Sequence, residues 1–142
     1  MSVIDIEILH EMVITARLHI KGHETEDEGI PLLTCDYSFS QEVDQRGLAK
    51  SQVTGGIINF SFISIEDEEI MWWMVSPNVD KSGKISFSGS EDEKVFKTLE
   101  FTGARCIYYR ESFARDIEMI QEISISAREI SLSRATHTNT WT

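Results

Sequence analysis

Regular alternation of apolar and polar residues predicts β-strands in two parts of this chain. In residues 12–20 polar side chains separate a set of apolar ones: Met12, Ile14, Ala16, Leu18 and Ile20. In residues 33–43 the alternating apolar positions are Leu33, Cys35, Tyr37, Phe39 and Val43. Since successive side chains of a strand point to opposite faces, each segment is predicted to have one buried face and one hydrated face.

A third strand-like segment, residues 53–65, carries apolar residues on both parities. One parity holds Ile58, Phe60 and Phe62, and the other holds Ile57, Ile63 and Ile65. A strand of this kind in a small all-β chain needs cover on both faces, and a second copy of the chain could supply it. We therefore predict that this strand lies at a subunit interface, with three candidate residues: Ile58, Phe60 and Phe62.

One helix is predicted, over residues 66–75. Its apolar residues recur at spacings of three and four: Ile70, Met71, Trp73 and Met74. Ser64 is the expected N-cap, and Pro77 ends the helix. Trp72 lies off the apolar stripe, which makes it a candidate for a partner surface.

The remaining segments are predicted to be strands, with two irregular points. Residues 85–88, 94–101, 104–110 and 116–132 are strand-like, with a bulge expected at Gly103 and a bulge or twist near Arg128. Seven to nine strands and one short helix predict a mainly β fold: a single domain, residues 1–142, built as a small closed barrel of antiparallel strands. Residues 1–11 form an N-terminal extension that is either an extra strand or a segment that docks on a neighbour, and residues 133–142 form a polar tail.

Charge and hydropathy exclude several functional classes. The formal net charge of −11 argues against binding to duplex nucleic acid, which requires a basic surface. No apolar run approaches the ~20 residues of a membrane-spanning helix. The first eleven residues lack the basic region and apolar core of a secretory signal, so the chain is expected to be cytoplasmic when made.

The sequence contains no pattern that predicts catalysis, a cofactor or a metal site. Its histidines lack metal-binding spacing and are expected on the surface: His10, His19, His23 and His137. Cys35 and Cys106 fall at apolar positions and are expected to be buried reduced thiols, with a disulfide as the alternative. We therefore expect a structural protein rather than an enzyme.

Several longer motifs resemble one protein family. The run CDYSFSQEVD at residues 35–44, the W-M-x-S-P sequence at 73–77 and the G-K-I-x-F strand at 83–87 occur in its order. L-E-F-x-x-A-x-C-x-x-Y at 99–109 and I-x-I-S-A-R-x-I at 123–130 follow. From residue 12 to 132 the chain resembles the Bacteroidetes branch of the type VI secretion tube proteins, the haemolysin-coregulated protein (Hcp, TssD) family.

This resemblance implies a barrel that assembles into homo-hexameric rings. The rings stack into a tube that a contractile sheath expels together with a spike and effectors, so the protein is secreted without a signal peptide. In the family a long loop contacts the next subunit or ring, and here it corresponds to residues 42–51, with candidate contacts Glu42, Asp44, Gln45, Arg46 and Lys50. Two alternatives remain: a subunit of a phage-tail-like or extracellular contractile injection particle, and a small-ligand-binding β-barrel.

Overall fold

The structure, a computed structural model, describes residues 13–38, 56–65, 67–76, 78–89 and 94–134. Within these residues lie one helix, α2 (Glu69–Val75), and eight strands: β1 (Ile14–Ile20), β2 (Ile30–Pro31), β3 (Thr34–Ser38), β4 (Gly56–Ile63), β5 (Lys81–Gly89), β6 (Val95–Ala114), β7 (Ile117–Ala127) and β8 (Glu129–Arg134). The mainly β fold with one short helix is thereby confirmed. The expectations for residues 1–11, for the connector residues 42–51 and for most of the tail lie outside the described residues.

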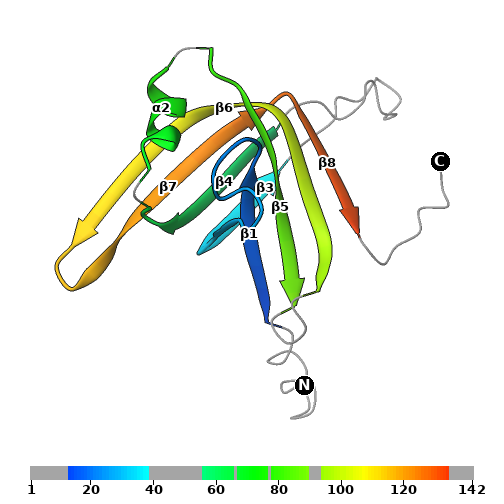
Figure 1. The fold of residues 1–142 in the computed structure, drawn as a ribbon, viewed down its shortest axis with the longest axis horizontal. Helices are drawn as coiled ribbons and strands as arrows, with labels where there is room; N and C mark the ends of the chain where they lie inside the picture. The colour runs from blue at the N-terminus through cyan, green and yellow to red at the C-terminus, as the bar shows by residue number, and fades with distance from the viewer. Residues whose placement is uncertain (1–12, 39–55, 66, 77, 90–93, 135–142) are drawn as a thin grey trace, which may run out of the picture.

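The strands form one antiparallel sheet in the order β2-β1-β5-β6-β7-β4-β3, with β8 also paired to β6. The long strand β6 holds the sheet together (Figure 1). Its first half pairs with β5 and β8, and its second half pairs with β7. The sheet bends so that its two halves face each other across the core, and β6 is the strand shared by both.

The bend in β6 lies at Gly103, where the sequence predicts a bulge. Gly103 has a φ of +61°, and a side chain there would meet the Arg128 guanidinium at 2.8 Å. Across the ladder, β7 ends at Ala127 and β8 begins at Glu129. The backbone N–H of Arg128 donates a hydrogen bond to the Thr102 carbonyl oxygen at 3.0 Å. Both strands therefore turn at the same level, as the change of apolar parity near Arg128 predicts.

The sheet is not closed, which corrects the predicted closed barrel. In the described part of the chain, β2 pairs with β1 and β3 pairs with β4, and neither edge strand pairs with the other. Residues 32 and 33 cross between the two edges, since the Leu32 N–H bonds Ala16 and the Leu33 N–H bonds Ser61. Beside this crossing lies a groove of about 1050 Å³ between β1 and β3, and residues of β5 and β6 also line it.

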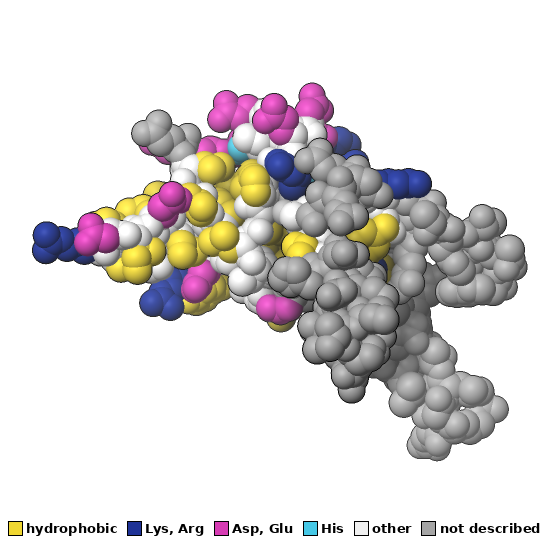
Figure 2. Space-filling model, turned by 90° about the horizontal axis from the view of Figure 1, so that it is seen from below, with side chains coloured by type: hydrophobic (Ala, Val, Ile, Leu, Met, Phe, Trp, Pro, Cys, Tyr) yellow, Lys and Arg dark blue, Asp and Glu magenta, His cyan; other side chains and the backbone are white. Residues whose placement is uncertain are grey.

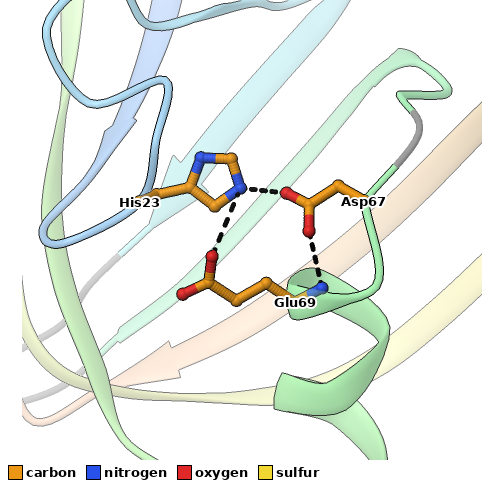
Figure 3. Close-up of side chains that lie close together, drawn as sticks. All are labelled: His23, Asp67 and Glu69. Carbon is orange, nitrogen blue, oxygen red and sulfur yellow. Dashed lines mark hydrogen bonds and ion pairs between the residues drawn. The ribbon is translucent and has the colours of Figure 1, made fainter.

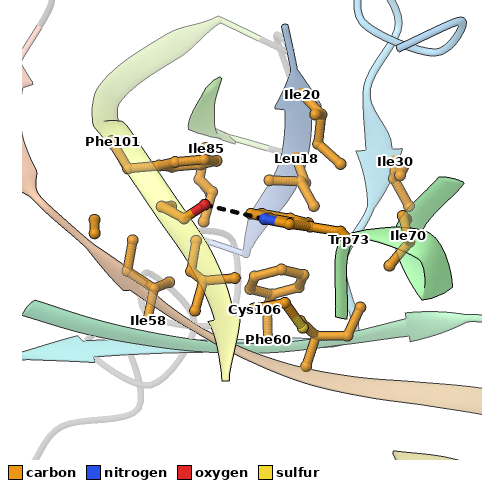
Figure 4. Packing of buried hydrophobic residues seen from close by; sticks show 14 of the residues in the cluster. Leu18, Ile20, Ile30, Ile58, Phe60, Ile70, Trp73, Ile85, Phe101 and Cys106 are labelled. Carbon is orange, nitrogen blue, oxygen red and sulfur yellow. Dashed lines mark hydrogen bonds between the residues drawn. The ribbon is translucent and has the colours of Figure 1, made fainter. Parts of the chain in front are cut away.

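Helix α2 packs over the bend in β6 and completes the core (Figure 4). Its Trp73 is 1% exposed, and the indole N–H donates a hydrogen bond to the Ala104 carbonyl oxygen at 3.0 Å. Around it lie side chains from both halves of the sheet, among them Leu18, Ile58, Phe60, Ile85 and Phe101. The indole therefore fills the space between the sheet halves and satisfies its one polar group there.

The start of α2 differs from the prediction. The helix begins at Glu69, with Glu68 as a cap residue that makes no side-chain cap bond. Ser64 instead donates to a Glu111 carboxylate oxygen at 2.6 Å, while Asp67 Oδ1 accepts the Glu69 backbone N–H at 2.6 Å.

No helix among the described residues is both long and apolar enough to cross a membrane.

The two faces of β4 have different roles. Ile58, Phe60 and Phe62 are at most 2% exposed in a single copy, whereas Ile57 and Ile63 are 45% and 46% exposed. The three side chains predicted to meet another subunit therefore lie in the core of one chain. Because side chains alternate along a strand, only the opposite face of β4 is left for a partner.

We expect Ile58→Ala to lower the free energy of unfolding by about 2–5 kcal/mol, because it leaves a cavity in the core. Ile57→Ala makes the same change one residue away on the exposed face and should cost less than about 1 kcal/mol. Urea denaturation followed by tryptophan fluorescence measures both. Equal losses for the two variants would show that the faces of β4 are misassigned.

Candidate assembly surface

The hairpin of β6 and β7 projects beyond the core and exposes apolar side chains. Ile123 and Ile125 of β7 are buried, but Ile117 and Met119, on the same parity, are 60% and 40% exposed. On the other strand Phe113 is 72% exposed. These exposed apolar side chains thus lie past the point where the rest of the chain covers the hairpin. We call Phe113, Ile117 and Met119 the hairpin patch.

Charged residues surround the hairpin patch at the turn. The chain reverses at Arg115 and Asp116, between the paired residues Ala114 and Ile117. Asp116 has a φ of +65°, a conformation that Asp tolerates better than most residues. Figure 2 shows hydrophobic side chains gathered along the projecting hairpin and charged ones at its tip. An apolar centre with a charged rim is typical of a protein–protein contact surface.

The outer face of β4 is less apolar than its sequence suggests. Between Ile57 and Ile63, Asn59 donates a hydrogen bond to Asp36 at 2.8 Å and accepts one from Ser124 at 2.5 Å. Ser61 forms a hydroxyl–hydroxyl hydrogen bond with Thr34 of β3 at 2.6 Å. This row of side-chain bonds links three neighbouring strands. The face can therefore remain hydrated, with the two isoleucines as isolated apolar groups.

Helix α2 contributes a second exposed apolar group. Trp72 is 63% exposed and Val75 is 61% exposed, while Trp73 points into the core. The structure places Trp72 on the surface, and its contact with a partner stays a prediction.

The candidate residues of the long connector do not lie in the described part of the chain. Their predicted contact with the next subunit or ring stays a prediction for all five: Glu42, Asp44, Gln45, Arg46 and Lys50.

Sequence reasoning missed the hairpin patch, although its pattern was visible. Ile117 and Met119 continue the parity of Ile123 and Ile125 within the predicted strand 116–132. That parity identifies the apolar face, but it does not tell where cover by the rest of the chain ends.

His23 is buried, which corrects the prediction that it lies on the surface. It is 4% exposed and contacts a carboxylate oxygen of Asp67 through Nε2, and Glu69 Oε2 lies 3.6 Å from the same nitrogen (Figure 3). The acidic segment 23–29 is thereby attached to the start of α2, although its sequence offered no apolar anchor. We call His23, Asp67 and Glu69 the loop–helix cluster.

The two cysteines are free thiols, Cys106 buried and Cys35 half-buried at the groove between β1 and β3. Burial, together with the negative charge of Asp36, raises the pKa of the Cys35 thiol to about 11. Burial also raises the pKa of Cys106, against the lowering effect of a backbone hydrogen bond at Tyr108. Both groups are therefore protonated at neutral pH, a state that disfavours nucleophilic chemistry.

We expect Cys35 to react slowly with a disulfide reagent at pH 8. Its pKa of about 11, against 9.0 for an unperturbed thiol, lowers the reactive thiolate fraction about 100-fold, and the rate should rise with pH up to about 11. Stopped-flow absorbance on a Cys106→Ser variant, folded and in urea, measures this, with Cys35→Ser as the matched control. A folded rate equal to the rate in urea would contradict the burial of this thiol.

Several solved structures share this fold. Hcp1 from Flavobacterium johnsoniae aligns with a TM-score of 0.67 and 27% identity, over 83% of this chain and 94% of that one. Hcp1 from Salmonella typhimurium aligns with the same TM-score at 13% identity, over 88% of this chain and 89% of that one. A chain from the sheath–tube complex of PVC, an extracellular contractile injection system in its extended state, aligns at 0.55 and 16% identity, over 94% and 99%.

The family comparison agrees with the fold. A comparison with curated proteins found no significant match. The family described as hemolysin coregulated protein Hcp (TssD) matches residues 12–142, which is nearly the whole chain. This chain therefore belongs to the Hcp (TssD) family.

Proposed function

We propose that six copies of this chain close into a ring, and that such rings stack into the inner tube of a type VI secretion system. A contractile sheath then expels the tube with its spike and effectors. The role of a tube subunit rests on membership of the Hcp family, which covers residues 12–142. The observation on this chain that supports it best is the hairpin patch, an apolar surface that a single copy leaves uncovered.

A ring of identical subunits needs two different surfaces that fit each other. The hairpin patch lies at the end of β6. At the start of β6, Val95 pairs with Ser88 of β5. The next residue of β5, Gly89, pairs with Ile14 of β1. Ile14 and Val95 are 55% and 37% exposed. We therefore assign the contact between neighbours to the hairpin patch of one copy and the apolar residues at the opposite end of β6 in the next.

The long connector is the second proposed contact. Its charged residues have both signs, which suits a contact that sets the register of one copy on another: Glu42, Asp44, Arg46 and Lys50. Charge complementarity of this kind supplies specificity more than affinity. We propose that it acts between stacked rings, while the apolar patches act within a ring.

A subunit of an extracellular contractile injection particle is the second candidate. The PVC chain covers 94% of this chain, and a chain from the anti-feeding prophage cap aligns at a TM-score of 0.54 and 15% identity. These similarities concern the fold alone. The match of the Hcp family to residues 12–142 favours the type VI tube. The same family match argues against the small-ligand barrel. The open sheet also argues against it, because the groove between β1 and β3 is not enclosed by a barrel.

We expect Ile117→Glu to abolish rings while the monomer stays folded, because the substitution puts a charge into an interface but costs nothing in the core. Glu118→Lys is the matched control: it also changes the charge, at the next residue of the same strand, on an exposed side chain off the patch parity. Native mass spectrometry counts the subunits, negative-stain microscopy shows rings, and circular dichroism checks the fold.

This experiment tests the tube role and the hairpin-patch contact separately. A wild-type chain that stays monomeric at high concentration would contradict the tube role. Rings of six that persist in Ile117→Glu would leave the tube role standing and would exclude the hairpin patch from the subunit contact.

A further inference from the structure

Three potential metal ligands converge where the segment after β1 meets the start of α2. We propose that the loop–helix cluster binds one divalent transition-metal ion of the zinc type through His23 Nε2, Asp67 Oδ2 and Glu69 Oε2. The ligand atoms all lie within 4.8 Å of one another. Figure 3 shows the imidazole and the two carboxylates directed toward a common point. This inference is independent of the tube role.

The spacing suits a small ion after one modest adjustment. Zinc bonds to nitrogen and oxygen are about 2.0–2.2 Å long, so tetrahedral ligand atoms lie roughly 3.2–3.6 Å apart. His23 Nε2 and Glu69 Oε2 are 3.6 Å apart. Asp67 Oδ2 contacts Nε2 directly and must move outward, so that an ion fits between the two atoms.

Each proposed ligand is held by a neighbouring group. Thr25 provides His23 Nδ1 with a hydroxyl oxygen at 2.7 Å and a backbone N–H at 3.1 Å. Nδ1 accepts the Thr25 N–H in this structure, and the Thr25 hydroxyl oxygen is near enough to accept a hydrogen bond from Nδ1 when Nε2 binds a metal. Asp67 Oδ1 accepts the Glu69 N–H, and Glu69 Oε1 accepts from Lys81 Nζ at 3.1 Å. Such outer partners orient ligands in metal sites.

Burial and charge also favour a dication. The His23 side chain is fully buried and that of Asp67 is 10% exposed, but the Glu69 side chain is 39% exposed, so the cluster meets solvent on the Glu69 side. The two carboxylates outnumber the one ammonium beside them, that of Lys81. An imidazole ligand selects transition metals over magnesium and calcium. The bound ion would join segment 23–29 to the helix that presents Trp72.

Removal of one ligand tests the site. Glu69→Gln removes one of the two anionic ligands, and Glu68→Gln is the matched control, because it makes the same change at the adjacent, exposed residue. The untagged full chain is titrated with Zn²⁺ by calorimetry, and with Co²⁺ by visible absorption of a four-coordinate site. Wild type and Glu68→Gln should bind one Zn²⁺ with a rise in Tm, and Glu69→Gln should lose at least ten-fold in affinity.

A second readout keeps the test decisive if a variant is destabilised. The ¹⁵N resonances of the wild-type His23 imidazole should shift on addition of Zn²⁺, with Nε2 as the coordinated nitrogen. Saturable binding with both signatures supports the site. Absence of binding in the wild type at about 100 μM Zn²⁺, unchanged His23 resonances, or equal affinity in Glu69→Gln would each overturn it.

Discussion

The hydrogen-bond ladder of β6 is the constraint on which this fold depends. One strand of twenty residues pairs with β5 and β8 over its first half and with β7 over its second half. It can belong to both halves only because it turns at Gly103, where a positive φ and the nearby Arg128 guanidinium disfavour a larger residue. Trp73 then donates its indole N–H to the Ala104 carbonyl, next to the turn, which places α2 over the core.

The same arrangement determines what a single copy leaves exposed. The core extends along β7 as far as Gln121, which is 2% exposed, whereas Met119 and Ile117, nearer the turn, are 40% and 60% exposed. Helix α2 has only seven residues and packs near the bend, so it cannot also cover the hairpin. An apolar surface remains at the far end of β6, away from the groove. This division into a covered core and an uncovered end fits a chain whose folding and assembly are separate steps.

Local pattern predicted most of the elements but not how they meet. The parity change near Arg128 and the isolated Gly103 marked the bend, because both are visible within one strand. Closure of the barrel was wrongly predicted, since the pairing of β2 and β3 depends on contacts that alternation does not encode. The same limit applies to His23, whose burial depends on Asp67, 44 residues away. The sequence identified Ile58, Phe60 and Phe62 as an apolar face of β4, but the same chain buries this face and no second copy is needed.

The edges of the open sheet decide how this chain can polymerise. Edge strands expose unpaired amide and carbonyl groups, and in many proteins they recruit further strands until fibrils form. Here β2 is two residues long and contains Pro31, which lacks an N–H, while β3 is short and carries the acidic side chain of Asp36. Both features discourage strand addition. Assembly of copies is thereby directed to side-chain surfaces instead of strand edges.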